Sequence, residues 1–387
     1  MHKNTPAQII EYSDPLEGFK GWLVRDRMCH RLCAGGMRVQ SGLTCEKLID
    51  MARNMTRKMQ IANLRVDGAK SGIDYDPESP GKTAAVSRFL QAIKPHIESS
   101  YSMGPDLNIE MDELDKIAQQ SGIPSVKMAI AKAQGWELEY YTARKRILKD
   151  RIGGWSVGRL RAGYGVAAAT LATLDFLNIS PQNGTVTIQG FGTLAKATAF
   201  RLHKAGVKII AIADVEKCLV AAGNSGLEVE RLLTLPGPLL DADASENYTV
   251  KPSEAILGQQ CDILIPAAVE KSVQADNAAS LQVKAIVPGA NLAVTGESEQ
   301  ILHNRSILVL PDFLAGCGGS LSMEGLFGPP EHPDAQSVLA HIENKMMEIV
   351  YKVLQRSEKE SISPTDSALR FCDEFVCMPD TRPYGTP

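Results

Sequence analysis

The sequence predicts an α/β protein of two domains, one of which contains a doubly wound parallel sheet. Apolar strands and helices alternate after residue 157, as they do in such sheets. Glycine-dense residues 151–165 separate this region from the part before it. The 387-residue length agrees, because single hydrophobic cores usually stop growing below roughly 250–300 residues. We expect one domain over 1–157, a second over 158–324, and C-terminal helices within 325–387 that pack back onto the first.

The N-terminal part predicts strands followed by a helix. Residues 18–40 mix alternating apolar positions with a Gly-Gly turn, which is typical of strands. Thr44 suits the N-cap of the helix that follows, and Lys58 lies beside its apolar face. Four apolar residues recur there at three- and four-residue spacing and predict one buried helix face: Leu48, Met51, Met55 and Met59.

The later part predicts a strand-helix-strand unit and then further strands. The unit comprises a strand at 186–189, a helix at 194–204 and a strand at 207–213, preceded by an apolar helix at 166–177. Three more strands are expected, at 263–265, 285–287 and 307–309. A long amphipathic helix should occupy 334–357, and the tail from Met378 should be loosely ordered.

Composition excludes several classes of function. The chain is 44% hydrophobic and 22% charged with a net charge of -4, so binding to nucleic acid or to an anionic membrane has no electrostatic support. The first residues lack the apolar core of a signal peptide, and no apolar run approaches the roughly 20 residues that span a bilayer. We therefore expect a cytoplasmic protein.

The cysteines are expected to be reduced, because a chain of this size needs no disulfides to stabilise its core. Cys29 and Cys33 form a CxxxC spacing with His30 beside the first of them, but no second ligand pair lies at finger-like spacing. We therefore interpret both as semi-buried strand cysteines and expect no metal. The full set is Cys29, Cys33, Cys45, Cys218, Cys261, Cys317, Cys372 and Cys377.

A G-x-G-x-x-A run predicts dinucleotide binding of the Rossmann type. It lies between a predicted strand and a predicted helix and reads Gly190, Phe191, Gly192, Thr193, Leu194 and Ala195. Gly190 permits the tight turn, Gly192 lets the backbone approach a pyrophosphate, and the helix N-terminus offers free N–H groups to the phosphates. Asp214, at the end of the second strand, would accept hydrogen bonds from the ribose hydroxyls and repel a 2′-phosphate, which favours NAD over NADP, although Lys217 is close enough to reach such a phosphate.

Three charged residues of the first domain are open to two interpretations. Lys58 at the edge of a helix face and Lys70 in the glycine-containing loop DGAKSGI could simply extend to solvent. A desolvated lysine instead has a lowered pKa and can act as a general base or acid near neutral pH. Asp106 in GPDLN is either a turn or N-cap residue or a partner in such chemistry.

The order of motifs resembles the glutamate/leucine/phenylalanine/valine dehydrogenase family over most of the chain. The segment around Lys70 is among the most specific signatures of that family and departs from it mainly at Asp67, where glycine is usual. The motifs are GGMR (35–38), MTRK (55–58), LRVDGAKSGIDYDP (64–77), GPDLN (104–108), GFGTLA (190–195), DILIPAAVE (262–270), PGAN (288–291) and AGCGG (315–319).

The resemblance implies a substrate domain followed by an NAD-binding Rossmann domain, and it implies a role for each matching residue. Lys58 would bind the α-carboxylate of an amino acid, Lys70 would activate the water that attacks the imino intermediate, and Asp106 would relay the proton. Ala267 and Asn291 would line the cofactor cleft. The substrate pocket would comprise Ala34, Gly35, Gly36, Met37, Gly104 and Ser320 together with Lys58.

One departure from the family bears on the substrate. Glutamate-specific members carry a lysine where this chain has Ala34, and burial of a glutamate side chain without that partner costs several kcal/mol. Gly104 has less bulk than the usual alanine, and Ser320 stands where valine is common. We therefore expect NAD-dependent oxidative deamination of a neutral, apolar or aromatic L-amino acid, or the reverse reductive amination, by a homo-oligomeric enzyme whose only other partners are small molecules.

Three further departures keep alternatives open. Ala162, Gly316 and Ser71 stand where the family has threonine, asparagine and glycine, and the serine expected after the second Gly-Gly pair is either Ser322 or displaced. A weakly active or inactive member that binds NAD as a regulatory subunit is therefore one alternative, since a fold alone does not guarantee activity. A glutamate dehydrogenase is the other.

Overall fold

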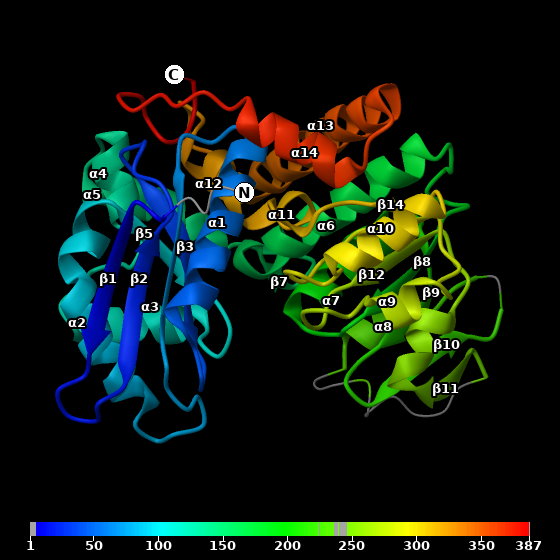
Figure 1. Cartoon of the computed structure of the whole chain (residues 1–387), viewed down its shortest axis with the longest axis horizontal. Helices are drawn as coiled ribbons and strands as arrows, with labels where there is room; N and C mark the ends of the chain where they lie inside the picture. The colour runs from blue at the N-terminus through cyan, green and yellow to red at the C-terminus, as the bar shows by residue number, and fades with distance from the viewer. Residues whose placement is uncertain (1–4, 224, 236–238, 240–245, 387) are drawn as a thin grey trace. The chain divides into compact units, whose positions relative to one another are not determined.

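The computed structural model describes residues 5–223, 225–235, 239 and 246–386, which fall into two compact units (Figure 1). The first unit comprises the chain up to Arg146 with 327–332 and the residues from Glu374 onward. The second comprises 147–326 and 333–373. The units therefore meet in the sequence at residue 146 and not at the expected residue 157, because the segment before α6 (Val157–Phe176) packs against that helix.

The first unit is built on a five-stranded mixed sheet of order β1-β2-β4-β3-β5. β4 is parallel to β3 and antiparallel to β2, and β3 is parallel to β5. The carboxyl ends of β3, β4 and β5 therefore lie at one edge of the sheet, where ligand sites of parallel sheets usually form. The strands are β1 (Gln8–Ser13), β2 (Lys20–Arg25), β3 (Cys33–Val39), β4 (Asp67–Ile73) and β5 (Tyr101–Pro105).

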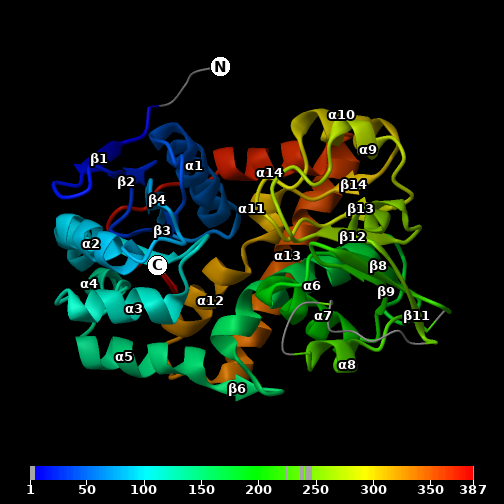
Figure 2. The ribbon, with the colours of Figure 1, turned by 90° about the horizontal axis from the view of Figure 1, so that it is seen from below.

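Helices cover both faces of this sheet, with α1 on one side and α2 and α3 on the other (Figure 2). The predicted N-cap of α1 is confirmed, since the Thr44 side chain accepts the Lys47 amide. Leu48, Met51 and Met59 are buried on the predicted face, whereas Met55 is half-buried. The helices are α1 (Cys45–Ile61), α2 (Lys82–Ser99), α3 (Met111–Gln120), α4 (Ala129–Gln134) and α5 (Leu138–Arg146).

The segment around Lys70 is a fully buried central strand and not the predicted loop. Its glycines misled the prediction, because glycine is uncommon in strands. Here they allow close packing: a Cβ at Gly68 would lie 2.1 Å from the Thr56 nitrogen of α1, and one at Gly72 would lie 2.6 Å from Leu43. β4 can therefore accept helix contacts that a larger residue would block.

The second unit contains a seven-stranded sheet of order β11-β10-β9-β8-β12-β13-β14. The strands from β9 to β14 in this order are parallel, and those expected around 263–265, 285–287 and 307–309 are confirmed as β12, β13 and β14. β10 and β11 add an antiparallel edge that the sequence did not predict. The strands are β8 (Thr185–Gln189), β9 (Lys208–Ala213), β10 (Lys217–Ala221), β11 (Tyr248–Pro252), β12 (Ile263–Pro266), β13 (Ala285–Ile286) and β14 (Leu308–Val309), and the short strands β6 (Arg151–Ile152) and β7 (Trp155–Ser156) form a separate hairpin.

The two C-terminal helices α13 and α14 belong to the second unit, whereas 327–332 and the residues from Glu374 onward belong to the first. α13 packs along α6, and Arg201 of α7 forms an ion pair with Glu343 of α13. No helix among the described residues is long and apolar enough to cross a membrane. The helices here are α6, α7 (Thr193–Lys204), α8 (Val229–Leu233), α9 (Ala275–Ala278), α10 (Gly296–Asn304), α11 (Asp312–Ala315), α12 (Gly318–Phe327), α13 (Ala335–Glu360) and α14 (Pro364–Asp373).

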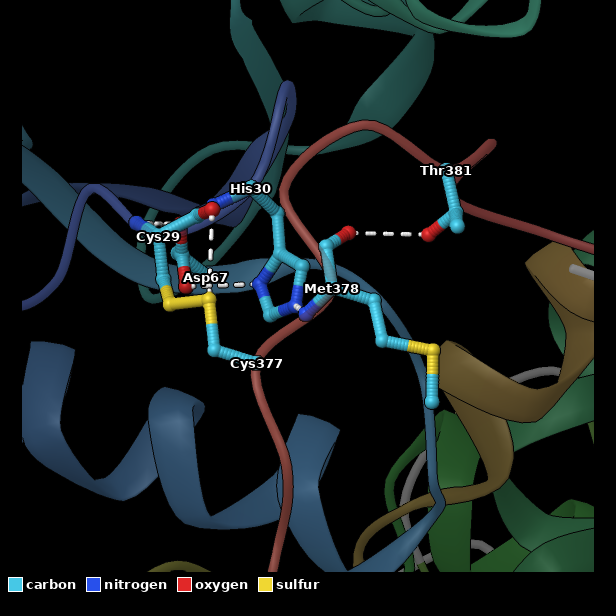
Figure 3. The surroundings of a disulfide bond; sticks show 6 residues. All are labelled: Cys29, His30, Asp67, Cys377, Met378 and Thr381. Atoms are coloured by element: carbon cyan, nitrogen blue, oxygen red, sulfur yellow. Dashed lines mark hydrogen bonds and ion pairs between the residues drawn. A yellow bond between two sulfur atoms is a disulfide. The ribbon is translucent and has the colours of Figure 1, made fainter.

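The C-terminal tail is ordered in the first unit, contrary to the loose order expected from Met378 onward. Arg65 donates hydrogen bonds to the carbonyl oxygens of Arg382 and Gly385, and Tyr384 is buried. Cys377 in this tail forms a disulfide with Cys29 (Figure 3). The expectation that every cysteine is reduced is therefore wrong for this pair, and a pairing across 348 residues leaves no local signal in the sequence.

Candidate active site

Lys70, Asp106 and Arg38 form a buried cluster of ion pairs in the first unit. Lys70 Nζ lies 3.1 Å from Asp106 Oδ1, and Arg38 Nε donates to Asp106 Oδ2 at 2.6 Å. The three side chains are 6%, 15% and 7% exposed, in the order Lys70, Asp106, Arg38. Three adjacent parallel strands supply them, since Lys70 lies in β4, Arg38 in β3, and Asp106 directly after β5. The sequence did not identify Arg38, although it immediately follows the Gly-Gly-Met segment.

The Gly-Gly pair of β3 brings these strands together. A Cβ at Gly35 would lie 1.7 Å from the Ala69 carbonyl oxygen, next to Lys70 in β4. A Cβ at Gly36 would lie 2.8 Å from the Pro105 carbonyl oxygen and 3.0 Å from the Asp106 Cβ. Any larger residue at either position would displace a strand that carries a member of the cluster.

The surroundings of the cluster lower the pKa values of both Lys70 and Asp106. Burial lowers the pKa of Lys70, and the nearby charges of Arg38 and Lys58 lower it further, while Asp106 opposes them. Burial by itself would raise the pKa of Asp106, but Lys70 and Arg38 outweigh it and hold that pKa below the usual value. The result is a carboxylate that stays ionised beside an amine that releases its proton more easily than an ordinary lysine. Such a pair suits proton transfer.

The other predicted substrate residues of the first unit differ in how far their side chains are buried. Lys58 on α1 is half-buried, and its charge acts on Lys70. Ala34 in β3 is half-buried and pairs with Ser102 of β5. The Met37 side chain is fully buried in the apolar core.

A second buried cation that the sequence analysis missed lies near Gly104. The Lys127 side chain is buried, and its Nζ lies 3.6 Å from the position of a Cβ at Gly104. Lys127 follows Asp106 by 21 residues and belongs to no motif, so only the folded chain brings it to this strand end.

In the second unit, the glycine-rich turn has the geometry that a dinucleotide needs. Gly190 has φ 107°, which favours glycine, and a Cβ there would lie 2.9 Å from the Ala267 carbonyl oxygen. Gly192 is the N-cap of α7, has no side-chain cap and faces open space, since no atom lies within 4 Å of a Cβ there. The amides of Thr193 and Leu194 at this helix N-terminus are therefore accessible to a phosphate. These residues fit a dinucleotide.

Two other predicted cofactor segments converge on this turn. β8 and β12 are adjacent, and the strand order reverses between them, which is where open α/β sheets bind ligands. Ala267 follows β12, and a Cβ at Gly289 would lie 2.8 Å from the Ala267 Cβ and 2.9 Å from Leu194. The turn that carries Asn291 is held because the amides of Gly289 and Ala290 donate to the Pro266 carbonyl oxygen.

Asp214 lies at the carboxyl end of β9, where the sequence predicted it. Its Oδ1 accepts the amides of Glu216 and Lys217, and its Oδ2 accepts the amide of Leu239. Each carboxylate oxygen has two lone pairs, so Oδ2 retains capacity for a further donor. The half-buried side chain thus fixes the loop after β9 and still presents a negative charge.

Ser320, the remaining predicted pocket residue, belongs to α12 in the second unit and is 9% exposed. Near it lies a cation that the sequence analysis missed. Arg161 of α6 donates to Ser322 Oγ at 3.1 Å and approaches the Gly319 carbonyl oxygen at 3.4 Å, and burial lowers its pKa. No carboxylate among the described residues forms an ion pair with it.

Comparisons of sequence point to one group of enzymes. A family model described as "Glutamate/Leucine/Phenylalanine/Valine dehydrogenase" matches residues 153–374, and one described as "Glu/Leu/Phe/Val dehydrogenase, dimerisation domain" matches residues 6–122. A glutamate dehydrogenase of Thermotoga maritima is 30% identical over 313 residues, which cover 79% of this chain and 71% of the relative. An NADP-specific glutamate dehydrogenase of Saccharolobus shibatae is 29% identical over 326 residues, covering 81% and 71%.

Comparisons of structure agree on the fold. A hetero-hexameric glutamate dehydrogenase of Thermus thermophilus, in a leucine-bound form, has a TM-score of 0.75 at 24% identity and covers 95% of this chain and 88% of its own. An L-tryptophan dehydrogenase of Nostoc punctiforme has a TM-score of 0.63 at 18% identity and covers 95% of each chain. The predicted α/β class with a Rossmann-type sheet is thus confirmed.

Proposed function

Because the chain belongs to the glutamate/leucine/phenylalanine/valine dehydrogenase family, we propose that it oxidatively deaminates a neutral, apolar or aromatic L-amino acid, or catalyses the reverse reductive amination. The chain is a nicotinamide-dependent dehydrogenase of this family. The single observation that carries the proposed substrate class is Ala34, which offers a methyl group where glutamate-specific members have a lysine.

We assign separate roles to Lys58 and to two residues of the buried cluster, Lys70 and Asp106. Lys58 binds the α-carboxylate of the substrate. A nicotinamide dinucleotide held at the glycine-rich turn would supply the hydride acceptor, and loss of hydride from the α-carbon would leave an imino group on the substrate. Neutral Lys70 then takes a proton from the water that attacks this group, which its lowered pKa permits. Asp106, 3.1 Å from Lys70 Nζ, stabilises the ammonium that forms and passes the proton onward.

Substrate preference is tested with the full chain, NAD and each of the twenty L-amino acids, by following NADH absorbance and ammonia release. Leucine, phenylalanine and tryptophan should be used more efficiently than alanine by about tenfold or more, because burial of a large apolar side chain contributes roughly 1.5–3 kcal/mol. Glutamate should be poor, and Ala34→Lys should shift the preference toward it. Faster use of glutamate than of these three by the wild-type chain would contradict the proposal.

An acidic amino acid is the second candidate, and Arg161 favours it. The guanidinium bonds to Ser322 and has no carboxylate partner among the described residues, so a substrate carboxylate could neutralise it. Arg161→Leu separates the candidates in the same assay. If the substrate is acidic, its KM rises strongly in this variant, whereas a neutral substrate depends on Arg161 only through packing.

NAD is proposed as the preferred cofactor because of Asp214. A 2′-phosphate near this carboxylate would meet like-charge repulsion of roughly 1–4 kcal/mol, enough to disfavour NADP about fivefold or more in kcat/KM. Asp214→Asn keeps an acceptor for the loop amides and removes the charge, so it should reduce this preference. Relatives specific for NADP and for NAD both exist, so kcat/KM must be measured with each cofactor to establish which one this chain prefers. A wild-type preference for NADP would refute the role of Asp214.

A homo-oligomer is also proposed, supported by the match of residues 6–122 to a dimerisation-domain family model. Light scattering on the purified chain measures its mass directly. A monomer at micromolar concentration would contradict this proposal. A chain that binds NAD but turns over no amino acid in the panel would instead be a regulatory subunit.

A further inference from the structure

The disulfide between Cys29 and Cys377 has a buried histidine beside it that the bond itself does not require. His30 follows Cys29 in the sequence, and the two sulfurs and a ring nitrogen of His30 all lie within 4.8 Å of one another (Figure 3). We propose that these three residues, when the cysteines are reduced, bind one Zn²⁺ or a similar thiophilic cation. The disulfide is then the oxidised form of the same site.

The orientation of His30 is the first argument. Its Nδ1 lies 3.0 Å from Asp67 Oδ1, and both side chains are only 3% exposed. A carboxylate at Nδ1 holds the proton there and leaves the lone pair on Nε2, as in the carboxylate–histidine pairs behind metal ligands. Among the described residues, Nε2 meets only the amide of Met378, at a long 3.4 Å. The lone pair on His30 Nε2 is thus oriented to bind a metal ion.

Asp67 also shapes the loop that carries the ligands. Its Oδ2 accepts the amides of Cys29 and His30, each at 2.7 Å, so one carboxylate fixes the backbone of both residues and the ring of the second. Asp67 stands where the family usually has glycine, and glycine could make none of these bonds. This departure from the family therefore supplies the hydrogen bonds that hold Cys29 and His30 in place.

The donor set selects the class of metal. Two thiolates and one imidazole favour Zn²⁺ and similar cations over Mg²⁺ or Ca²⁺, which prefer oxygen ligands. Bonds of about 2.0–2.3 Å in a tetrahedral site require ligand atoms roughly 3.3–3.8 Å apart, and the three ligand atoms here lie within 4.8 Å of one another. Cys377 is exposed, so a water molecule can take the fourth position.

Oxidation and metal binding exclude each other in this scheme. A dithiol reductant supplies two electrons to the disulfide, becomes a cyclic disulfide itself, and leaves one proton on each of Cys29 and Cys377. Binding of Zn²⁺ then releases both protons, because the thiolates are the ligands. Either state joins the C-terminal tail to the loop before β3, since Cys377 lies in the tail and Cys29 in that loop.

The test uses the full chain, reduced with dithiothreitol and desalted without oxygen. Titration with Zn²⁺ against a chromogenic chelator should show one tight site per chain, and Co²⁺ should give the near-ultraviolet absorption of thiolate ligands. Cys377→Ser should lose this site. Cys45→Ser, which alters a half-exposed cysteine outside the cluster, should retain it. Asp67→Asn should weaken binding roughly 10–100-fold, as expected for removal of the carboxylate behind a histidine ligand.

Three results would overturn the proposal. The first is that the reduced wild-type chain binds no more Zn²⁺ than Cys377→Ser. The second is that the Co²⁺ complex lacks thiolate absorption. The third is that chain reoxidised with glutathione disulfide, which should bind none, binds as much as the reduced chain. None of these measurements depends on turnover, so the metal site and the proposed enzymatic function stand or fall separately.

Discussion

Lys70→Ala should lower turnover of the best amino acid by roughly 100- to 10,000-fold, the usual contribution of a positioned general acid or base. The variant removes the amine that forms an ion pair with Asp106. NAD affinity should stay unchanged, because the glycine-rich turn belongs to the second unit. Steady-state kinetics give the turnover, and quenching of NADH fluorescence gives the cofactor affinity.

Lys20→Ala is the matched control for this variant. Lys20 lies in β2 of the same sheet, its side chain is 56% exposed, and its ion pair with Glu11 is at the surface. Such exposed pairs contribute little to stability. Lys20→Ala should therefore retain normal turnover. Near-normal turnover in Lys70→Ala would show that this lysine is not the base.

Asp106→Asn should have the second largest effect, a loss of turnover of about 100-fold or more. The substitution keeps the shape of the side chain but removes the negative charge that pairs with the buried side chains of Lys70 and Arg38. KM should change less than kcat, since Lys58 and not Asp106 is proposed to bind the substrate. Steady-state kinetics at saturating NAD separate the two parameters.

Asp50→Asn is the control for the loss of a carboxylate charge in the same unit. Asp50 lies on α1 with its side chain 71% exposed, and its ion pair with Arg53 is a surface contact. Turnover by Asp50→Asn should match that of the wild type. If Asp106→Asn also turned over normally, the buried pair would be structural and the proposed proton relay would be wrong.

The cofactor turn could be predicted from the sequence because its determinants are local. Gly190 and Gly192 are adjacent in the chain to the strand and helix that they join, and a positive φ at Gly190 is what a tight turn between them needs. Asp214 ends the next strand of the same unit. Hydrophobic periodicity sets these positions, so the parallel strands of the second unit followed from the pattern, whereas the antiparallel edge of β10 and β11 did not.

The substrate side of the site was less predictable because its contacts are not local. Arg38, Lys70 and Asp106 come from three strands whose order in the sheet the sequence does not state. Lys70 was placed in a loop because glycine was taken as a sign of a turn, whereas the glycines of β4 make room for α1. The charges at Lys127 and Arg161 belong to no motif, and only packing brings them near Gly104 and Ser322.

The contacts of the C-terminal region are also not local, so the sequence did not predict them. The amphipathic pattern predicted the helix α13, but an apolar face does not identify its partner, and the partner is α6 of the second unit. The tail was expected to be loosely ordered because the last residues of a chain usually are. Arg65 and Cys29, more than 300 residues earlier, hold it by hydrogen bonds and a disulfide.

The most direct test of the central claim, that neutral Lys70 beside ionised Asp106 is the base, is the pH dependence of kcat/KM for the wild type and Asp106→Asn. The account predicts a wild-type rate that rises with pH through a pKa below the ordinary lysine value of 10.5. Because the Asp106 charge favours the protonated lysine, its removal lowers the pKa of Lys70. The rise in Asp106→Asn should therefore move to lower pH.

The amine of the substrate titrates identically with both proteins, so the difference between the two profiles reports the enzyme alone. A shift to lower pH is the result that the account predicts. An unchanged midpoint, or a shift to higher pH, would contradict it, because the titrating group would then not be the lysine that Asp106 contacts.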